Sequence, residues 1–111
     1  MGSHRIDRIS EDMKRCLADI IKDLKDPRIS KLLSVIRVDV TGDLSYAKVY
    51  VSAIEGYDKT LESVKGLKSA EGYIKRQLNS QMKLRKIPAL NFIADNSIEN
   101  GAHIARIIED F

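Results

Sequence analysis

The chain has few of the residue types on which many enzymes and extracellular domains depend. Its 111 residues include no tryptophan, one cysteine, two histidines and two prolines, and aromatic residues make up only 5%. A single cysteine excludes an internal disulfide and favours a reducing compartment. No apolar run approaches the roughly 20 residues of a membrane-spanning helix. We therefore expect a cytoplasmic protein with no transmembrane segment and no secretory signal.

The scarcity extends to catalytic and metal-binding groups. His4 and His103 lie near opposite ends of the chain, and neither belongs to a motif with metal-ligand spacing. Cys16 falls on the apolar face of a predicted helix, where a small core residue is the simplest interpretation. There is no P-loop and no G-x-G-x-x-G motif. We expect no catalytic residue, no metal and no cofactor.

What the chain does have is enough apolar residue for one core. Hydrophobic residues make up 43% of the sequence, and its length suits a single domain spanning residues 1–111. We expect residues 1–4 to be either disordered or a cloning scar, and they carry no weight in the interpretation.

Hydrophobic periodicity predicts the first half of the fold. Apolar residues at three- and four-residue spacing indicate a helix over about residues 6–25, ended by Asp26-Pro27 because a residue before proline avoids helical geometry. Two strands follow at 35–40 and 46–53, joined by a turn at 41–44. The residues expected to face the core from the two strands are Ile36, Val38 and Val40, and Ala47, Val49, Val51 and Ala53.

The second half reads as a long helical region, a strand and a final helix. The helical region covers 58–82, with Asp58 as its N-cap and an interruption at Gly72. A third strand is predicted at 90–94 and a last helix from Asn96 or Ser97. The apolar stripe of the helical region consists of Leu61, Val64, Leu67, Ile74 and Leu78.

This order of elements predicts an α+β fold. A strand, a helical crossover and another strand usually form a right-handed parallel pair. The simplest architecture is a three-stranded mixed sheet with its helices on one face.

Charge is distributed unevenly along the chain. The net charge is only +3, but the segment from Lys59 to Lys86 contains eight basic and two acidic residues. The rest of the chain has 11 basic and 14 acidic residues. All of the positive excess therefore lies in one quarter of the sequence, which is typical of a protein that binds a polyanion.

Within this segment the basic residues recur at three- and four-residue spacing and so share one helix face. Acidic partners at that spacing are nearly absent, and like charges repel, which favours an anion on this face over a merely solvated one. At Gly72 a bare backbone would allow a phosphate to approach. The predicted RNA-binding residues are Lys65, Lys68, Gly72, Lys75, Arg76, Lys83, Arg85 and Lys86.

Several segments together resemble one protein family. The order of elements is similar to that of a type II KH domain, but a G-x-x-G loop is absent, and Ser69-Ala70-Glu71-Gly72 stands in its place. This kink motif resembles that of the ribosome-binding factor A family. The other matching segments are residues 25–29, 42–52, 84–92 and 95–98 followed by Gly101.

The resemblance covers about residues 5–111 and implies a function. It implies a monomeric, cytoplasmic, non-enzymatic factor that binds the free small (30S) ribosomal subunit and assists late maturation and processing of 16S rRNA, including growth in the cold. The kinked helix pair and its basic surface are the implied RNA-facing site.

Two alternatives stay open at this point. One is a generic KH-like protein that binds single-stranded RNA, which tight binding to short unstructured RNA would favour. The other is a small enzyme or protein-interaction module, for which the sequence offers no candidate site.

Overall fold

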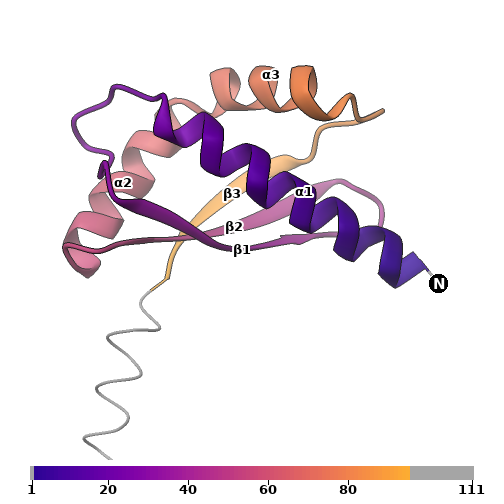
Figure 1. Ribbon diagram of the computed structural model, residues 1–111, viewed down its shortest axis with the longest axis horizontal. Coiled ribbons are helices and arrows are strands. Elements are labelled where there is room, and N and C mark those ends of the chain that lie inside the picture. Colours follow the sequence, from indigo (N-terminus) through magenta and orange to yellow (C-terminus); the bar gives the residue numbers. More distant parts are fainter. Residues whose placement is uncertain (1, 96–111) are drawn as a thin grey trace, which may run out of the picture.

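The computed structural model describes residues 2–95, with the backbone alone for residues 2–5 (Figure 1). Six elements follow one another along the chain: α1 (Gly2–Lys22), β1 (Leu33–Val40), β2 (Tyr46–Ala53), α2 (Tyr57–Ser69), α3 (Glu71–Met82) and β3 (Ala89–Ala94). The order agrees with the predicted one over these residues. The helix predicted from Asn96 or Ser97 lies outside the described residues.

The three strands form one mixed sheet in the order β1-β2-β3. β1 and β2 are antiparallel, with Val40 opposite Ala47, and β3 runs parallel to β2, with Tyr46 opposite Ala89. The chain between the parallel strands passes through α2 and α3, because parallel neighbours need a crossover connection. The predicted α+β, type II KH-like architecture with a mixed sheet is confirmed.

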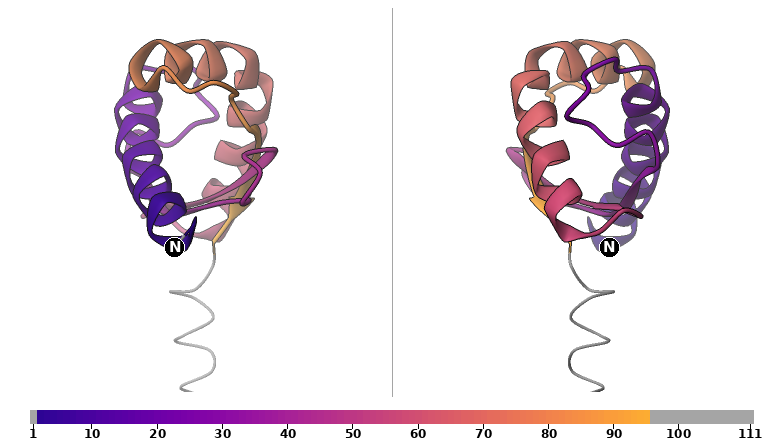
Figure 2. Two further views of the ribbon diagram at one scale, coloured as in Figure 1. Left: turned by 90° about the vertical axis from the view of Figure 1, so that its right-hand side faces the viewer. Right: turned by 90° about the vertical axis from the view of Figure 1, so that its left-hand side faces the viewer.

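All three helices lie on one face of the sheet, as predicted (Figure 2). α1 packs against β1, α2 packs against β2 and β3, and α3 packs against α1. The alternating set of β2 points into this layer and is buried, as predicted: Ala47, Val49, Val51 and Ala53. Within residues 2–95 the opposite face of the sheet carries no helix, so side chains such as Tyr46 and Lys48 are exposed there.

α1 ends earlier than predicted. It stops at Lys22, so the prediction that Asp26-Pro27 ends it is wrong. The amides of Asp23 and Leu24 each donate to a carbonyl three residues back, at 3.1 Å, which tightens the last turn. The chain thereby leaves the helix axis before Pro27, and Ile29 in the following loop is buried in the core.

β1 begins two residues earlier than predicted and contains a bulge between Val35 and Arg37. A bulge inserts one residue and shifts the alternation of the strand. Ile36 is therefore 40% exposed, which corrects the prediction that it faces the core. Val38 and Val40, beyond the bulge, are buried as predicted.

α2 also begins differently from the prediction. The residue before it is Gly56, with a φ of 125° that favours glycine, and no side chain caps the helix, so the prediction of Asp58 as N-cap is wrong. The Thr60 hydroxyl stabilises this turn instead, because it accepts from the Ala53 amide and donates to the Gly56 carbonyl, both at 2.9 Å. Thr60 takes the buried position here, and Leu61 is 41% exposed, contrary to prediction.

Candidate nucleic-acid interface

The predicted kink is a junction between two separate helices (Figure 1). The break falls at Ala70, whose φ of −96° and ψ of 9° depart from helical values. Gly72 lies inside the first turn of α3, so the prediction of an interruption at Gly72 is wrong by two residues. The physical reason is packing: α2 lies on the sheet, whereas α3 turns away to pack on α1.

The side chain of Glu71 joins this junction to the sheet. Its carboxylate accepts a hydrogen bond from the Leu90 amide at 3.0 Å. The amides of Ala89 and Asp95, which lie at the two ends of β3, donate to carbonyls on the side of β2. The Leu90 amide, one residue out of phase, therefore points away from β2, toward the free edge of the sheet. Glu71 thus satisfies an edge donor and faces the sheet rather than the basic residues of the helices.

The structure divides the predicted RNA-binding residues into two groups. The junction group lies on both helices beside the break and consists of Lys65, Lys68, Gly72, Lys75 and Arg76. The loop group follows the end of α3 and consists of Lys83, Arg85 and Lys86. At 1.5 Å rise per residue, the two groups are roughly 10–15 Å apart along α3.

The junction group is accessible to a ligand. Lys65, Lys68, Gly72 and Arg76 are exposed, and Lys75 is half-buried. Around Gly72, no atom lies within 4 Å of the place a β-carbon would occupy. The backbone at this position can therefore be approached from solvent, as the sequence interpretation required.

One residue of the loop group, Lys86, contacts the turn between β1 and β2. Lys83 ends α3 in a left-handed conformation, with a φ of 52°, which turns the chain toward β3. The Lys86 ammonium donates to the Ser45 hydroxyl at 3.3 Å. Asp43 sits in the same turn, where hydrogen bonds from Ser45 and Thr41 lower its pKa to about 2. An acidic residue thus lies near each group: Asp43 in the turn that Lys86 contacts, and Glu71 between Ala70 and Gly72 at the junction.

The cations of the junction group form no ion pair with the residues that the structure describes. None of the four ion pairs found within residues 2–95 includes them. The two acidic residues of the basic segment are engaged elsewhere: Glu62 pairs with Lys59 at 3.2 Å, and Glu71 bonds to Leu90. Several like charges without partners form a surface of positive potential that an anionic ligand would stabilise.

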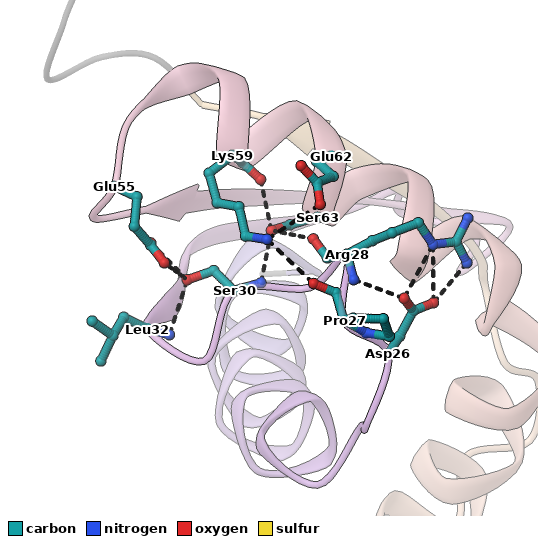
Figure 3. Close-up of polar contacts among 9 residues, drawn as sticks. All are labelled: Asp26, Pro27, Arg28, Ser30, Leu32, Glu55, Lys59, Glu62 and Ser63. Carbon is teal, nitrogen blue, oxygen red and sulfur yellow. Dashed lines mark hydrogen bonds and ion pairs between the residues drawn. The ribbon is translucent and has the colours of Figure 1, made fainter.

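The loop between α1 and β1 contains a second set of polar contacts (Figure 3), which sequence reasoning treated only as a connection. Arg28 donates to the Asp26 carboxylate from its amide at 2.9 Å and from its guanidinium at 2.6 Å. The side-chain bond from Arg28, with the backbone bond, lowers the pKa of Asp26 to about 2. The pair stabilises the loop locally around Pro27.

Further contacts attach this loop to α2 (Figure 3). The Ser63 hydroxyl accepts from the Ser30 amide at 2.9 Å, and the Lys59 ammonium donates to the Pro27 carbonyl at 3.2 Å. At Gly66 an added β-carbon would lie 2.6 Å from a side-chain carbon of Ile29, so the loop and the helix are in direct contact. The loop therefore covers one side of α2 and leaves the exposed side of that helix to the basic residues.

The described part of the chain contains one cysteine and no cluster of potential metal ligands. Cys16 is half-buried, and its pKa is raised by burial and by the charges of Asp12 and Asp19, which favours the unreactive thiol. Within residues 2–95 no cluster of acidic, histidine or cysteine side chains could hold a metal ion, and no helix is long and apolar enough to cross a membrane. The side chains of His4 and His103 lie outside the described residues.

Sequence reasoning missed one residue of the basic surface. The scarcity of aromatic residues argued against base stacking, yet Tyr73 on α3 is 43% exposed. It follows Gly72 directly and stands one helical turn before Arg76. That spacing was the available signal, but a tyrosine in a helix is as often a core residue as an exposed one.

Known proteins are similar to this chain in both sequence and fold. The family model described as Ribosome-binding factor A matches residues 5–108. A relative of that name from Acetivibrio thermocellus is 50% identical over 107 residues, covering 96% of this chain and 87% of the relative. The crystal structure of ribosome-binding factor A from Thermus thermophilus has a TM-score of 0.72 at 30% identity, over 80% of this chain and 93% of that one. A Thermus thermophilus homology model fitted into a cryo-EM map of a 30S complex has a TM-score of 0.64 at 32% identity, over 76% and 88% of the two chains.

Proposed function

This chain belongs to the ribosome-binding factor A family, and from that membership we propose that it binds the free small (30S) ribosomal subunit as a non-enzymatic assembly factor. We further propose that it assists late maturation and processing of 16S rRNA, including in the cold. The observation that carries the proposal is the positive charge of the junction group, which forms no ion pair within residues 2–95, on a fold shared with a protein fitted into a 30S map.

The mechanism assigns phosphate contacts to the basic residues. Lys65, Lys68, Lys75 and Arg76 would neutralise phosphates of 16S rRNA at the helix junction, and the loop group would contact the same strand or a neighbouring one. Phosphate contacts orient a protein on RNA without reading its sequence. Selectivity for the subunit would then come from the shape of the folded RNA. We propose that the factor acts in the cytoplasm as a monomer, since the junction group and the loop group of one chain are sufficient for such contacts.

The direct test is co-sedimentation of the protein with purified 30S subunits, 50S subunits and whole ribosomes at several salt concentrations. We expect binding to free 30S subunits alone, with an affinity that falls as salt rises because counterions are released from the RNA. Equal binding to all particles, or tight binding to short unstructured RNA, would favour a generic RNA-binding protein instead.

Charge reversal at the junction tests the proposed face. The double variant Lys75→Glu/Arg76→Glu should weaken 30S binding and reduce the slope of log affinity against log salt by about 2, one for each lost phosphate contact. A matched control is Lys31→Glu/Lys48→Glu, which changes net charge equally at exposed positions outside both basic groups. Equal losses in the two double variants would show that only net charge matters and would contradict the proposed face.

A further inference from the structure

Tyr73 places an aromatic ring on the surface of the basic segment. Its side chain is 43% exposed, and it is the third residue of α3. Tyr46 is exposed at 62%, but it lies on β2, on the sheet face that carries no helix within residues 2–95. Tyr73 is thus the exposed aromatic residue that the described fold brings into the basic segment.

The surroundings of Tyr73 combine open space with positive charge. Gly72, directly before it, has no side chain and no neighbouring atom within 4 Å of its β position. Arg76 follows at i+3, so its side chain is a neighbour of Tyr73 on the helix surface, and it is exposed. Lys68 stands just before the junction and is also exposed. An aromatic ring flanked by cations is suited to a ligand that has both a flat face and anionic groups.

A nucleotide has that combination, and the charge of the face selects it over other partners. The ring would stack on the flat face of a base, while the cations beside it would neutralise the phosphates on either side. An apolar protein surface would cover the ring but would leave the cations beside it without anionic partners. Of the two acidic residues in the segment, Glu62 forms an ion pair with Lys59, and the carboxylate of Glu71 accepts a hydrogen bond from the Leu90 amide.

We infer that Tyr73 stacks on an unpaired base of the bound RNA, so that the junction binds a single-stranded nucleotide rather than the backbone of a duplex alone. The inference rests on the proposed 30S binding and adds the kind of RNA element that is bound. An aromatic contact of this type is tolerant of base identity, because every base has a flat face.

The experiment measures 30S affinity at several salt concentrations for the wild-type protein and for Tyr73→Phe, Tyr73→Leu and Tyr73→Ala. Tyr73→Phe should bind nearly as well as the wild type, because it keeps the ring. Tyr73→Leu and Tyr73→Ala should bind about 5-fold to 100-fold more weakly, as expected for the loss of one stacked base. The slope of log affinity against log salt should stay unchanged, because no phosphate contact is lost. Tyr46→Leu is the matched control and should bind like the wild type.

Each other outcome has a distinct meaning. Wild-type affinity for Tyr73→Leu would overturn the inference, because a leucine can replace tyrosine against an apolar protein surface but cannot stack on a base. A reduced salt slope in Tyr73→Leu would also overturn it, since the residue would then act by positioning cations. Failure of the wild-type protein to bind 30S subunits would instead contradict the proposed function itself. Urea unfolding of each variant separates loss of binding from loss of structure.

Discussion

Two glycines six positions apart experience opposite surroundings. An added β-carbon at Gly66 would meet Ile29 at 2.6 Å, whereas at Gly72 it would meet nothing within 4 Å. Gly66 lies on α2 and is buried against the loop before β1, whereas Gly72 lies on α3 and is exposed. The same residue type therefore serves close packing at one position and ligand access at the other.

Alanine substitutions should separate these roles. Gly66→Ala should destabilise the protein by about 1–3 kcal/mol, because Ile29 is buried and the loop must shift to admit a methyl group. Gly72→Ala should raise stability by about 0.5–1 kcal/mol, since alanine is the better helix former and meets no obstacle. Urea unfolding at equilibrium checks both values. Equal effects of the two substitutions would contradict the contact between the loop and α2.

The ion pair between Asp26 and Arg28 should make stability depend on pH in a defined range. The pKa of Asp26 is lowered from 3.8 to about 2, chiefly by the side-chain bond from Arg28. Because the folded pKa lies below the unfolded one, the pair contributes stability above about pH 4, and this contribution is lost as the pH falls toward 2.

The measurement compares urea unfolding of the wild type and Asp26→Asn between pH 2 and pH 6. The difference in the free energy of unfolding should be largest above about pH 4 and should shrink toward zero near pH 2. Asp43 has a similarly low pKa, but it is present in both proteins and its contribution cancels. A difference that does not change with pH would show that the charge of Asp26 is not what stabilises the loop.

At the scale of elements, the junction between α2 and α3 depends on a bond to a distant strand. Removing Glu71 leaves the part-buried Leu90 amide without its acceptor, so Glu71→Ala should destabilise the protein by about 1–3 kcal/mol. Glu62→Ala is the matched control: its pair with Lys59 is 49% exposed on the glutamate side and should contribute less than about 1 kcal/mol. Thermal or urea unfolding measures both. If the two variants lost equal stability, the Leu90 bond would not be what holds the junction.

The elements show where sequence patterns are sufficient and where they fail. The alternation in β2 predicted its bounds and buried face, because a strand with one buried face needs a period of two. The same reasoning failed at Ile36, since a bulge inserts a residue that no alternation can reveal. It failed again at the start of α2, where Thr60 bonds to Ala53 and replaces the expected side-chain cap.

At the scale of the molecule, the architecture of residues 2–95 was predictable because apolar periodicity and the crossover rule together leave few arrangements of their three strands and three helices. The sequence was sufficient to predict that residues 59–86 are rich in basic residues, but not which contacts the acidic residues among them make. The contact made by the Glu71 carboxylate depends on Leu90, which lies 19 residues further along the chain. The exposure of Tyr73 likewise depends on how α3 packs on α1, which no local pattern specifies.

The bond between Glu71 and Leu90 has a consequence for the behaviour of the protein at high concentration. β1 and β3 are the two outer strands, and an outer strand with unpaired amides can recruit a strand from another molecule and start a fibril. On β3 the Leu90 amide already donates to the Glu71 carboxylate of α3. On β1 the bulge at Ile36 distorts the strand. Within residues 2–95, each outer strand of the sheet therefore has a feature that opposes pairing with a strand of another molecule.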